Sequence, residues 1–146
     1  LAIVEAARLP DSRVIDLPLM PGGSGRVVVA PADSHASGVM PCVSRFRTLE
    51  RRGRFALVEA EASRAYRHQV RVHLAASGWP IAGDREYGGA ARPELAGRHA
   101  LHASHVAWAG DARVPAFAVD SPLPEDLVAF FTGSAGGGDS IKVESS

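Results

Sequence analysis

The chain has 146 residues, of which 46% are hydrophobic and 22% charged, and its 16 basic and 16 acidic residues cancel. This length predicts one domain with a sizeable core and is too short for two. No apolar run is long enough to cross a membrane as a helix, and a lone cysteine, Cys42, cannot form an internal disulfide. We therefore expect a protein without a membrane partner in a reducing, cytoplasmic setting.

The first part of the chain predicts two strands separated by loops. Residues 1–5 are mostly apolar and indicate a strand, whereas residues 8–16 contain Pro and Asp and favour a connection. The glycine-rich residues 21–25 predict a loop, because ordering several glycines in a regular element costs backbone entropy. A second strand is predicted at residues 26–30, where three valines follow one another.

Residues 42–60 predict an antiparallel hairpin. Side chains alternate in character along residues 42–49, as in a strand with one face in water. Residues 51–54 turn the chain, and residues 55–60 supply the partner strand.

The hairpin and the segment after it are basic, although the whole chain is neutral. Residues 45–71 hold eight arginines against three glutamates. Arginine suits contacts with RNA phosphates and base edges, because its planar guanidinium donates paired hydrogen bonds. The codon usage of a GC-rich genome produces the same enrichment, so composition alone leaves both explanations open.

Residues 67–77 predict a helix that ends at Gly78 in the left-handed conformation, with Pro80 preventing continuation. Val70 and Leu74 are four residues apart and can face a core together. A different face of this helix is then left for functional side chains.

That second face carries His68 and Arg71, which are three residues apart. His68 and His73 are five residues apart, about 140° around a helix, so they cannot hold one metal ion between them. We expect no metal site.

The rest of the chain predicts a strand, a helix and a tail. Residues 98–108 alternate as a strand does, and residues 123–131 begin with Pro and acidic residues, as helices prefer. The Gly/Ser-rich residues 132–146 predict a flexible tail. The whole predicts an α+β domain at residues 1–131, with a mixed, largely antiparallel sheet and a few short helices.

Six short motifs follow one another along the chain. They are Leu-Ala-Ile-Val-Glu at 1–5, His-Gln-Val-Arg-Val-His-Leu at 68–74, Pro-Ile-Ala-Gly-Asp at 80–84, Tyr-Gly at 87–88, Leu-His-Ala at 101–103 and Pro-Leu-Pro-Glu-Asp-Leu at 122–127. This succession resembles the RluA-type RNA pseudouridine synthases over residues 1–131. The family signature Thr-Gly-Arg-Thr-His-Gln-Ile-Arg-Val-His matches closely in its second half, whereas residues 64–67 read Arg-Ala-Tyr-Arg.

The resemblance implies a pseudouridine synthase-like fold and the isomerisation of uridine in ribosomal or transfer RNA, with no cofactor. The essential aspartate of the family stands in a His-Arg-Leu-Asp motif that lies before the position of Leu1 and is absent from this sequence. We therefore expect the C-terminal part of a catalytic domain, inactive alone.

By the same resemblance, Arg71 is the arginine that pairs with the nucleophilic aspartate. An ordinary salt bridge from Arg71 to Glu59 or Glu61 is the alternative. Asp84 is expected to bind the backbone of a tight turn, and Tyr87 to have a structural role.

The predicted RNA contacts lie on the basic hairpin and at the start of the helix. They are Arg45, Arg47, Arg51, Arg52, Arg54, Arg64, Arg67, His68 and Gln69. His68 and Gln69 serve equally well in capping the helix backbone. The alternative function is a non-catalytic RNA-binding or scaffold module. A missing half would leave an uncovered sheet edge or apolar face, through which we expect self-association.

Overall fold

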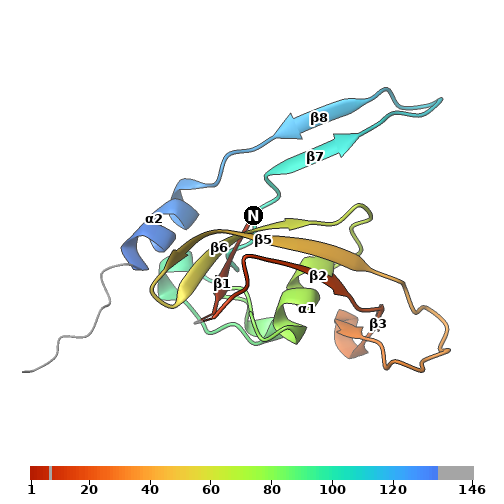
Figure 1. Ribbon diagram of the computed structural model, residues 1–146, viewed down its shortest axis with the longest axis horizontal. Helices are drawn as coiled ribbons and strands as arrows, with labels where there is room; N and C mark the ends of the chain where they lie inside the picture. The colour runs from red at the N-terminus through yellow and green to blue at the C-terminus, as the bar shows by residue number, and fades with distance from the viewer. Residues whose placement is uncertain (7, 135–146) are drawn as a thin grey trace, which may run out of the picture.

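The computed structural model describes residues 1–6 and 8–134, which form the expected α+β fold (Figure 1). The elements are β1 (Ala2–Glu5), β2 (Ser12–Asp16), β3 (Leu19–Pro21), η1 (Gly23–Gly25), β4 (Val27–Val29), β5 (Val43–Arg52), β6 (Phe55–Glu61), α1 (Gln69–Ala76), η2 (Arg85–Tyr87), η3 (Pro93–Leu95), β7 (His105–Trp108), β8 (Phe117–Asp120) and α2 (Glu125–Gly133). Neither helix within this part of the chain is long and apolar enough to cross a bilayer.

The central sheet has the strand order β1-β6-β5-β2, and every neighbouring pair is antiparallel. The predicted hairpin is confirmed as β5 and β6. It is longer than predicted, because β5 continues to Arg52 and the turn consists of Gly53 and Arg54 alone. Gly53 has a φ of +55°, a backbone conformation that glycine adopts without steric cost.

The prediction of a connection over residues 8–16 is wrong in its second half, because residues 12–16 form the edge strand β2. Ile15 is its one buried side chain, so the strand shows little of the alternation that betrays a half-buried strand. The strand forms because it pairs with β5, with Arg13 opposite Phe46, and this tertiary pairing cannot be read from the local sequence.

Strand β1 is enclosed on both sides. One side pairs with β6, and the other exchanges main-chain hydrogen bonds with two loop segments: Ile3 N donates to Ala100 O, and Ala82 N donates to Ile3 O, both at 2.9 Å. The predicted strand at residues 98–108 is thus correct only over β7. Its earlier residues meet β1 through the isolated bridge Ala2–Leu101 and the hydrogen bond of Ile3 with Ala100.

The helices cover one face and one end of the central sheet. Helix α1 lies against the face of β5 that carries the buried Ser44 and Phe46. Helix α2 packs at the end formed by the β5–β6 turn, where the Phe130 ring meets Phe55 edge-on at 5.1 Å. Residues 132–133 continue α2 into the segment predicted as a tail, and residues 135–146 lie outside the described part.

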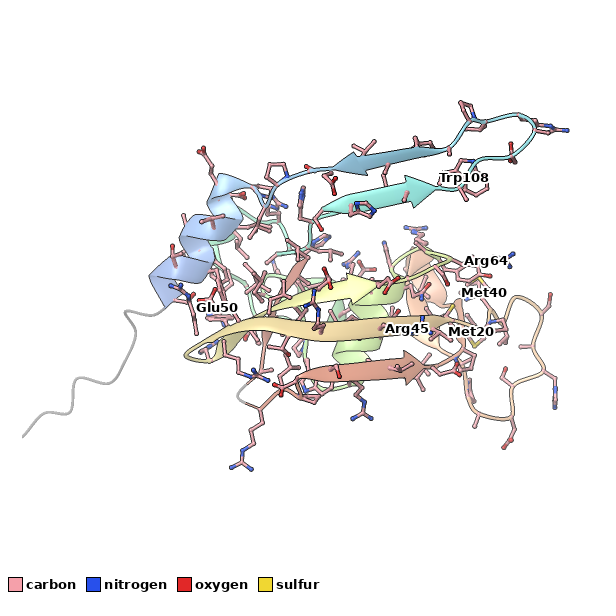
Figure 2. All side chains as sticks on the ribbon, turned by 45° about the horizontal axis from the view of Figure 1, so that its top comes forward. Met20, Met40, Arg45, Glu50, Arg64 and Trp108 are labelled. Atoms are coloured by element: carbon pink, nitrogen blue, oxygen red, sulfur yellow. The ribbon has the colours of Figure 1, made fainter. Side chains whose placement is uncertain are left out.

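Strands β7 and β8 pair only with each other among the described residues and form a two-stranded ribbon (Figures 1 and 2). Trp108 lies at the outer end of β7 (Figure 2). The register places Val106 opposite Val119 and Trp108 opposite Phe117, so the four side chains share one face of the ribbon. They are 44% to 54% exposed, which gives the apolar uncovered face that the sequence led us to expect.

Candidate active site

Arg71 emerges from α1 toward the turn at residues 81–89. Its Nε and Nη2 atoms donate to the two oxygens of Asp84, each at 2.7 Å, and Nη2 also donates to Glu86 Oε2 at 2.8 Å. The Arg71 side chain is 11% exposed and that of Asp84 1%. The alternative of a salt bridge to Glu59 or Glu61 is wrong, because the carboxylates of the turn reach Arg71 instead.

Asp84 therefore has a different role from the one predicted. Its carboxylate binds Arg71, and the turn is closed by its main-chain oxygen, which accepts hydrogen bonds from Tyr87 N at 3.1 Å and Gly89 N at 2.8 Å. A Cβ atom at Gly89 would overlap Ile81 O, so only glycine allows the chain to close here. The hydrogen bonding of Arg71 to the Asp84 carboxylate raises the pKa of Arg71, which secures the charged form of the guanidinium.

Tyr87 joins this turn to two other segments. Its hydroxyl accepts a hydrogen bond from Val27 N at 3.0 Å and lies 2.8 Å from His68 Nδ1. The guanidinium carbons of Arg71 and Arg26 lie 4.7 Å and 5.3 Å from the centre of its ring, within the range of cation–π attraction. Tyr87 thus links Val27, His68, Arg26 and Arg71, which is in keeping with the structural role predicted for it.

His68 precedes α1 with a φ of +58°, so the helix starts at Gln69 and not at residue 67 as predicted. A left-handed histidine is uncommon and is held in place by its surroundings, in this case the bond to Tyr87. His68 Nδ1 and the Tyr87 hydroxyl form a hydrogen bond whose direction depends on the tautomer of the ring. Burial first, and then the charge of Arg71, lower the pKa of His68, so the ring is neutral at pH 7.

Gln69 is placed differently from the other predicted RNA contacts. It is 2% exposed, and its amide nitrogen donates to Val43 O and to Ser44 Oγ, both at 3.0 Å. Its amide oxygen accepts from Tyr66 N at 3.1 Å. Both ends of the Gln69 amide are used inside the protein, so a direct RNA contact by Gln69 is excluded. Its hydrogen bonds anchor the start of α1 instead.

The network continues from Ser44 to His73, which is fully buried. Ser44 Oγ lies 3.0 Å from His73 Nδ1, and His73 Nε2 lies 3.0 Å from Leu17 O. The carbonyl can only accept, so Nε2 carries the proton and Ser44 donates to Nδ1. Every polar atom of this chain of contacts is satisfied in the neutral form of His73, and burial lowers its pKa.

Four of the five predicted RNA-binding arginines of the hairpin are engaged with carboxylates in this structure. Arg47 binds Glu59 at 2.8 Å, Arg51 binds Asp11 at 2.7 Å, Arg52 binds Glu50 at 2.5 Å and Arg54 binds Glu5 at 3.2 Å. The first three pairs are exposed, and such pairs contribute about 0–1 kcal/mol each. Arg47, Arg51 and Arg52 can therefore exchange a carboxylate for a phosphate at small cost. The Glu5 side chain is only 17% exposed and also binds Arg92.

Arg45, Arg64 and Arg67 are exposed and form no salt bridge within the described residues. Arg45 lies on β5 and Arg64 on the loop beyond β6, at the same end of the molecule (Figure 2). Arg26, which the sequence analysis overlooked, stands beside Tyr87 and donates through Nη2 to Glu86 O. No three His, Cys, Asp or Glu side chains of the described segments are grouped as metal ligands would be.

Proteins similar to this chain are RNA pseudouridine synthases, although no protein-family model matches it. YhcT, an uncharacterised RNA pseudouridine synthase of Bacillus subtilis (strain 168), is 35% identical over 92 residues, 62% of this chain and 30% of that protein. Ribosomal large subunit pseudouridine synthase D of Pseudomonas aeruginosa is 32% identical over 126 residues, 78% of this chain and 38% of that protein.

A solved structure shares the fold. Human RNA pseudouridylate synthase domain containing 1 matches with a TM-score of 0.65 at 20% identity, covering 83% of this chain and 52% of that one. The fold is thus that of a pseudouridine synthase-like domain. The chain belongs to the RluA-type family of RNA pseudouridine synthases, as its motifs led us to expect. It spans between 20% and 38% of the length of the curated relatives it matches.

Proposed function

We propose that the chain is part of the catalytic domain of an RNA pseudouridine synthase, which isomerises uridine to pseudouridine in RNA. The observation that carries this proposal is the geometry of Arg71. Its side chain is nearly buried and is oriented by two hydrogen bonds to Asp84, yet its Nη1 atom makes no hydrogen bond within residues 1–6 and 8–134. A guanidinium held in this way keeps donors for one further acceptor.

The reaction explains why a further acceptor is expected. The bond between C1′ of the ribose and N1 of uracil breaks, the base turns, and C1′ bonds to C5, while C5 loses a proton and N1 gains one. Substrate and product are isomers, so no oxidant, reductant or cofactor is consumed. A carboxylate that works in a pocket closed by the base loses hydration, which raises its pKa, and donors from Arg71 would oppose that rise.

The charges around Arg71 refine its proposed role. Asp84 and Glu86 together leave one negative charge in excess over the guanidinium. Arg71 therefore offers the nucleophilic aspartate oriented hydrogen-bond donors and no surplus positive charge. Asp84 acts in this proposal as a positioning residue, since it fixes the plane of the guanidinium.

The aspartate that the family resemblance requires is absent from this sequence, and Asp84 is committed to Arg71. We therefore expect the isolated 146-residue chain to form no pseudouridine. Release of tritium from RNA labelled at C5 of uridine measures the reaction directly, because C5 loses its hydrogen. Tritium release by the isolated chain above the protein-free rate would contradict this expectation.

A chimaera tests the proposal itself. This chain replaces the matched 126 residues of the Pseudomonas aeruginosa synthase, and large-subunit ribosomal RNA labelled at C5 is the substrate. We expect the chimaera to release tritium and Arg71→Ala to reduce the rate by about 100-fold or more, the loss typical of an oriented charge-stabilising donor. Arg71→Lys should fail as well, because lysine cannot bind two acceptors in a plane.

The matched control in the chimaera is Arg113→Ala, which removes an exposed arginine at the tip of the β7–β8 ribbon. It should leave the rate unchanged. A chimaera that is folded by circular dichroism but releases no tritium would overturn the proposed activity. Salt-sensitive RNA binding by that inactive chimaera would instead support the alternative, a non-catalytic RNA-binding module.

The proposed substrate class is ribosomal RNA, supported by relatives named as ribosomal large subunit synthases. Such a substrate fits the cytoplasmic setting expected from the sequence. We propose that Arg45, Arg47, Arg51, Arg52 and Arg54 add contacts to the RNA backbone, with phosphates replacing the exposed carboxylate partners of Arg47, Arg51 and Arg52. Raising salt should weaken any such contact.

A further inference from the structure

A second basic group, separate from the hairpin, lies at the turn of Gly25. Arg26 and Arg67 are far apart in the sequence, but both reach the turn at Gly25: Arg26 follows it in the chain, and Arg67 Nη2 would lie 3.8 Å from a Cβ built on it. Neither arginine forms a salt bridge within the described residues. Both side chains belong to exposed residues.

The backbone on both sides of this group is held in an unusual conformation. Ser24 has a φ of +57° and His68 a φ of +58°, and both are non-glycine residues in the left-handed region. Such conformations cost about 1–3 kcal/mol and persist where the surroundings enforce them, often at functional sites. Here they set the positions from which Arg26 and Arg67 extend.

Tyr87 fixes the first of the two arginines relative to Arg71. Arg26 lies over the Tyr87 ring, whose centre is also 4.7 Å from the guanidinium carbon of Arg71. Arg26 also donates to Glu86 O, a neutral acceptor, so its charge stays uncompensated. The Glu86 carboxylate, in contrast, is bound by Arg71.

We propose that Arg26 and Arg67 form a clamp for backbone phosphates of RNA beside the Arg71 site, with Tyr87 as its anchor. Two guanidinium groups without a salt-bridge partner, brought to the Gly25 turn from separate segments, suit phosphate oxygens, which accept paired hydrogen bonds from arginine. The clamp deepens the proposed function and rests on it for its choice of RNA: it holds the strand that carries the uridine, whereas the hairpin arginines contact RNA at a distance.

The test measures binding of fluorescein-labelled oligouridine to the 146-residue chain by fluorescence anisotropy over a range of salt concentrations. The double variant Arg26→Ala/Arg67→Ala should bind about tenfold more weakly. Each lost phosphate contact lowers the slope of log K against log salt by about 0.7 on a single strand, so the slope should fall by about 1.4.

The matched control is Arg8→Ala/Arg113→Ala, which removes the same charge from two other exposed arginines. It should leave affinity and slope close to those of the unaltered chain. The conservative variant Arg26→Lys/Arg67→Lys should keep the slope, because lysine still neutralises a phosphate as a point charge. Circular dichroism spectra that match the unaltered chain show that each variant is folded.

Three results would overturn the clamp. They are an unchanged slope in the folded Ala variant, an equal loss in the control, and the absence of salt-dependent oligouridine binding by the unaltered chain. The two proposals fail separately. If the chimaera is inactive but the clamp variant loses salt-dependent binding while the control does not, the clamp stands and the proposed activity is rejected. If the chimaera is active but the slope of log K against log salt is unchanged in the clamp variant, the activity stands and the clamp is rejected.

Discussion

At the scale of single residues, the sequence motif located Arg71 but not its partners. Its place on the helix followed from the match to the family signature, in which Arg71 stands three residues after His68. Asp84 and Glu86 follow it by 13 and 15 residues, across a turn whose path depends on glycines and on β1. The bidentate pair is a tertiary contact, and no local pattern distinguishes the carboxylate of Asp84 from that of an ordinary turn aspartate.

Arg26 was overlooked for a related reason. It stands alone after a glycine-rich loop, outside the arginine-rich residues 45–71 that drew attention to the hairpin. Clustering in the sequence is a poor guide here, because four of the hairpin arginines meet carboxylates in space. Arg26 forms no salt bridge within the described residues and stands where separate segments meet, beside Tyr87.

A pH prediction belongs to His73, whose burial lowers its pKa below the ordinary value of 6.5. Below pH 6.5, His73 binds a proton in the unfolded chain but not in the folded chain, so the free energy of unfolding should fall with decreasing pH. The limiting slope is about 1.4 kcal/mol per pH unit. The stabilisation is fully present above pH 6.5 and is lost toward the folded pKa, and His68 contributes with the same sign.

Urea denaturation at a series of pH values from 7.5 to 5 checks this. His73→Gln should lower the free energy of unfolding at pH 7, since it breaks the contacts with Ser44 and Leu17. It should also reduce the pH dependence. A His73→Gln variant with the full pH dependence of the unaltered chain would show that other groups cause it.

At the scale of elements, local patterns located the hairpin and both helices, whose residues alternate or recur with the expected period. They failed for β2 and for the start of β7. Strand β2 buries one side chain, and its order comes from pairing with β5. Residues near 100 resemble a strand because they alternate, but they serve as a cover for β1 without forming a ladder.

The turn at residues 81–89 is the element on which the Arg71 site depends, and Gly89 is its most sensitive position. We expect Gly89→Ala to destabilise the fold by about 1–3 kcal/mol, because the new methyl group collides with Ile81 O and presses on Asp84 N. Thermal unfolding measures the change. Gly23→Ala, where a Cβ meets nothing within 4 Å, is the control and should lower Tm far less. Equal effects of the two changes would argue against the close packing of this turn.

At the scale of the whole molecule, the β7–β8 ribbon was not foreseen as a separate unit. Alternation predicted one strand, while β8 escaped notice because its side chains are all exposed. The sequence did lead us to expect an apolar uncovered face. We place this face on the β7–β8 ribbon, where the half-exposed apolar side chains are those of Val106, Trp108, Phe117 and Val119.

The ribbon carries the prediction of self-association. Trp108→Ser/Phe117→Ser should reduce the rise of the sedimentation coefficient with protein concentration. Tm should change little, because both side chains are about half exposed and pack on no other element of the core. Sedimentation of the unaltered chain as a monomer at every concentration would show that self-association does not occur. If the sedimentation coefficient of the double variant still rises with protein concentration, another surface of the protein mediates the self-association.

The hydrogen bond from Val27 N to the Tyr87 hydroxyl spans 60 positions of the chain. Its amide hydrogen is shielded only while two distant segments remain docked, and their docking also positions Arg26 and His68. Deuterium uptake at this one amide therefore reports how often the whole arrangement around the phenol ring opens, and it does so without any label, ligand or substrate.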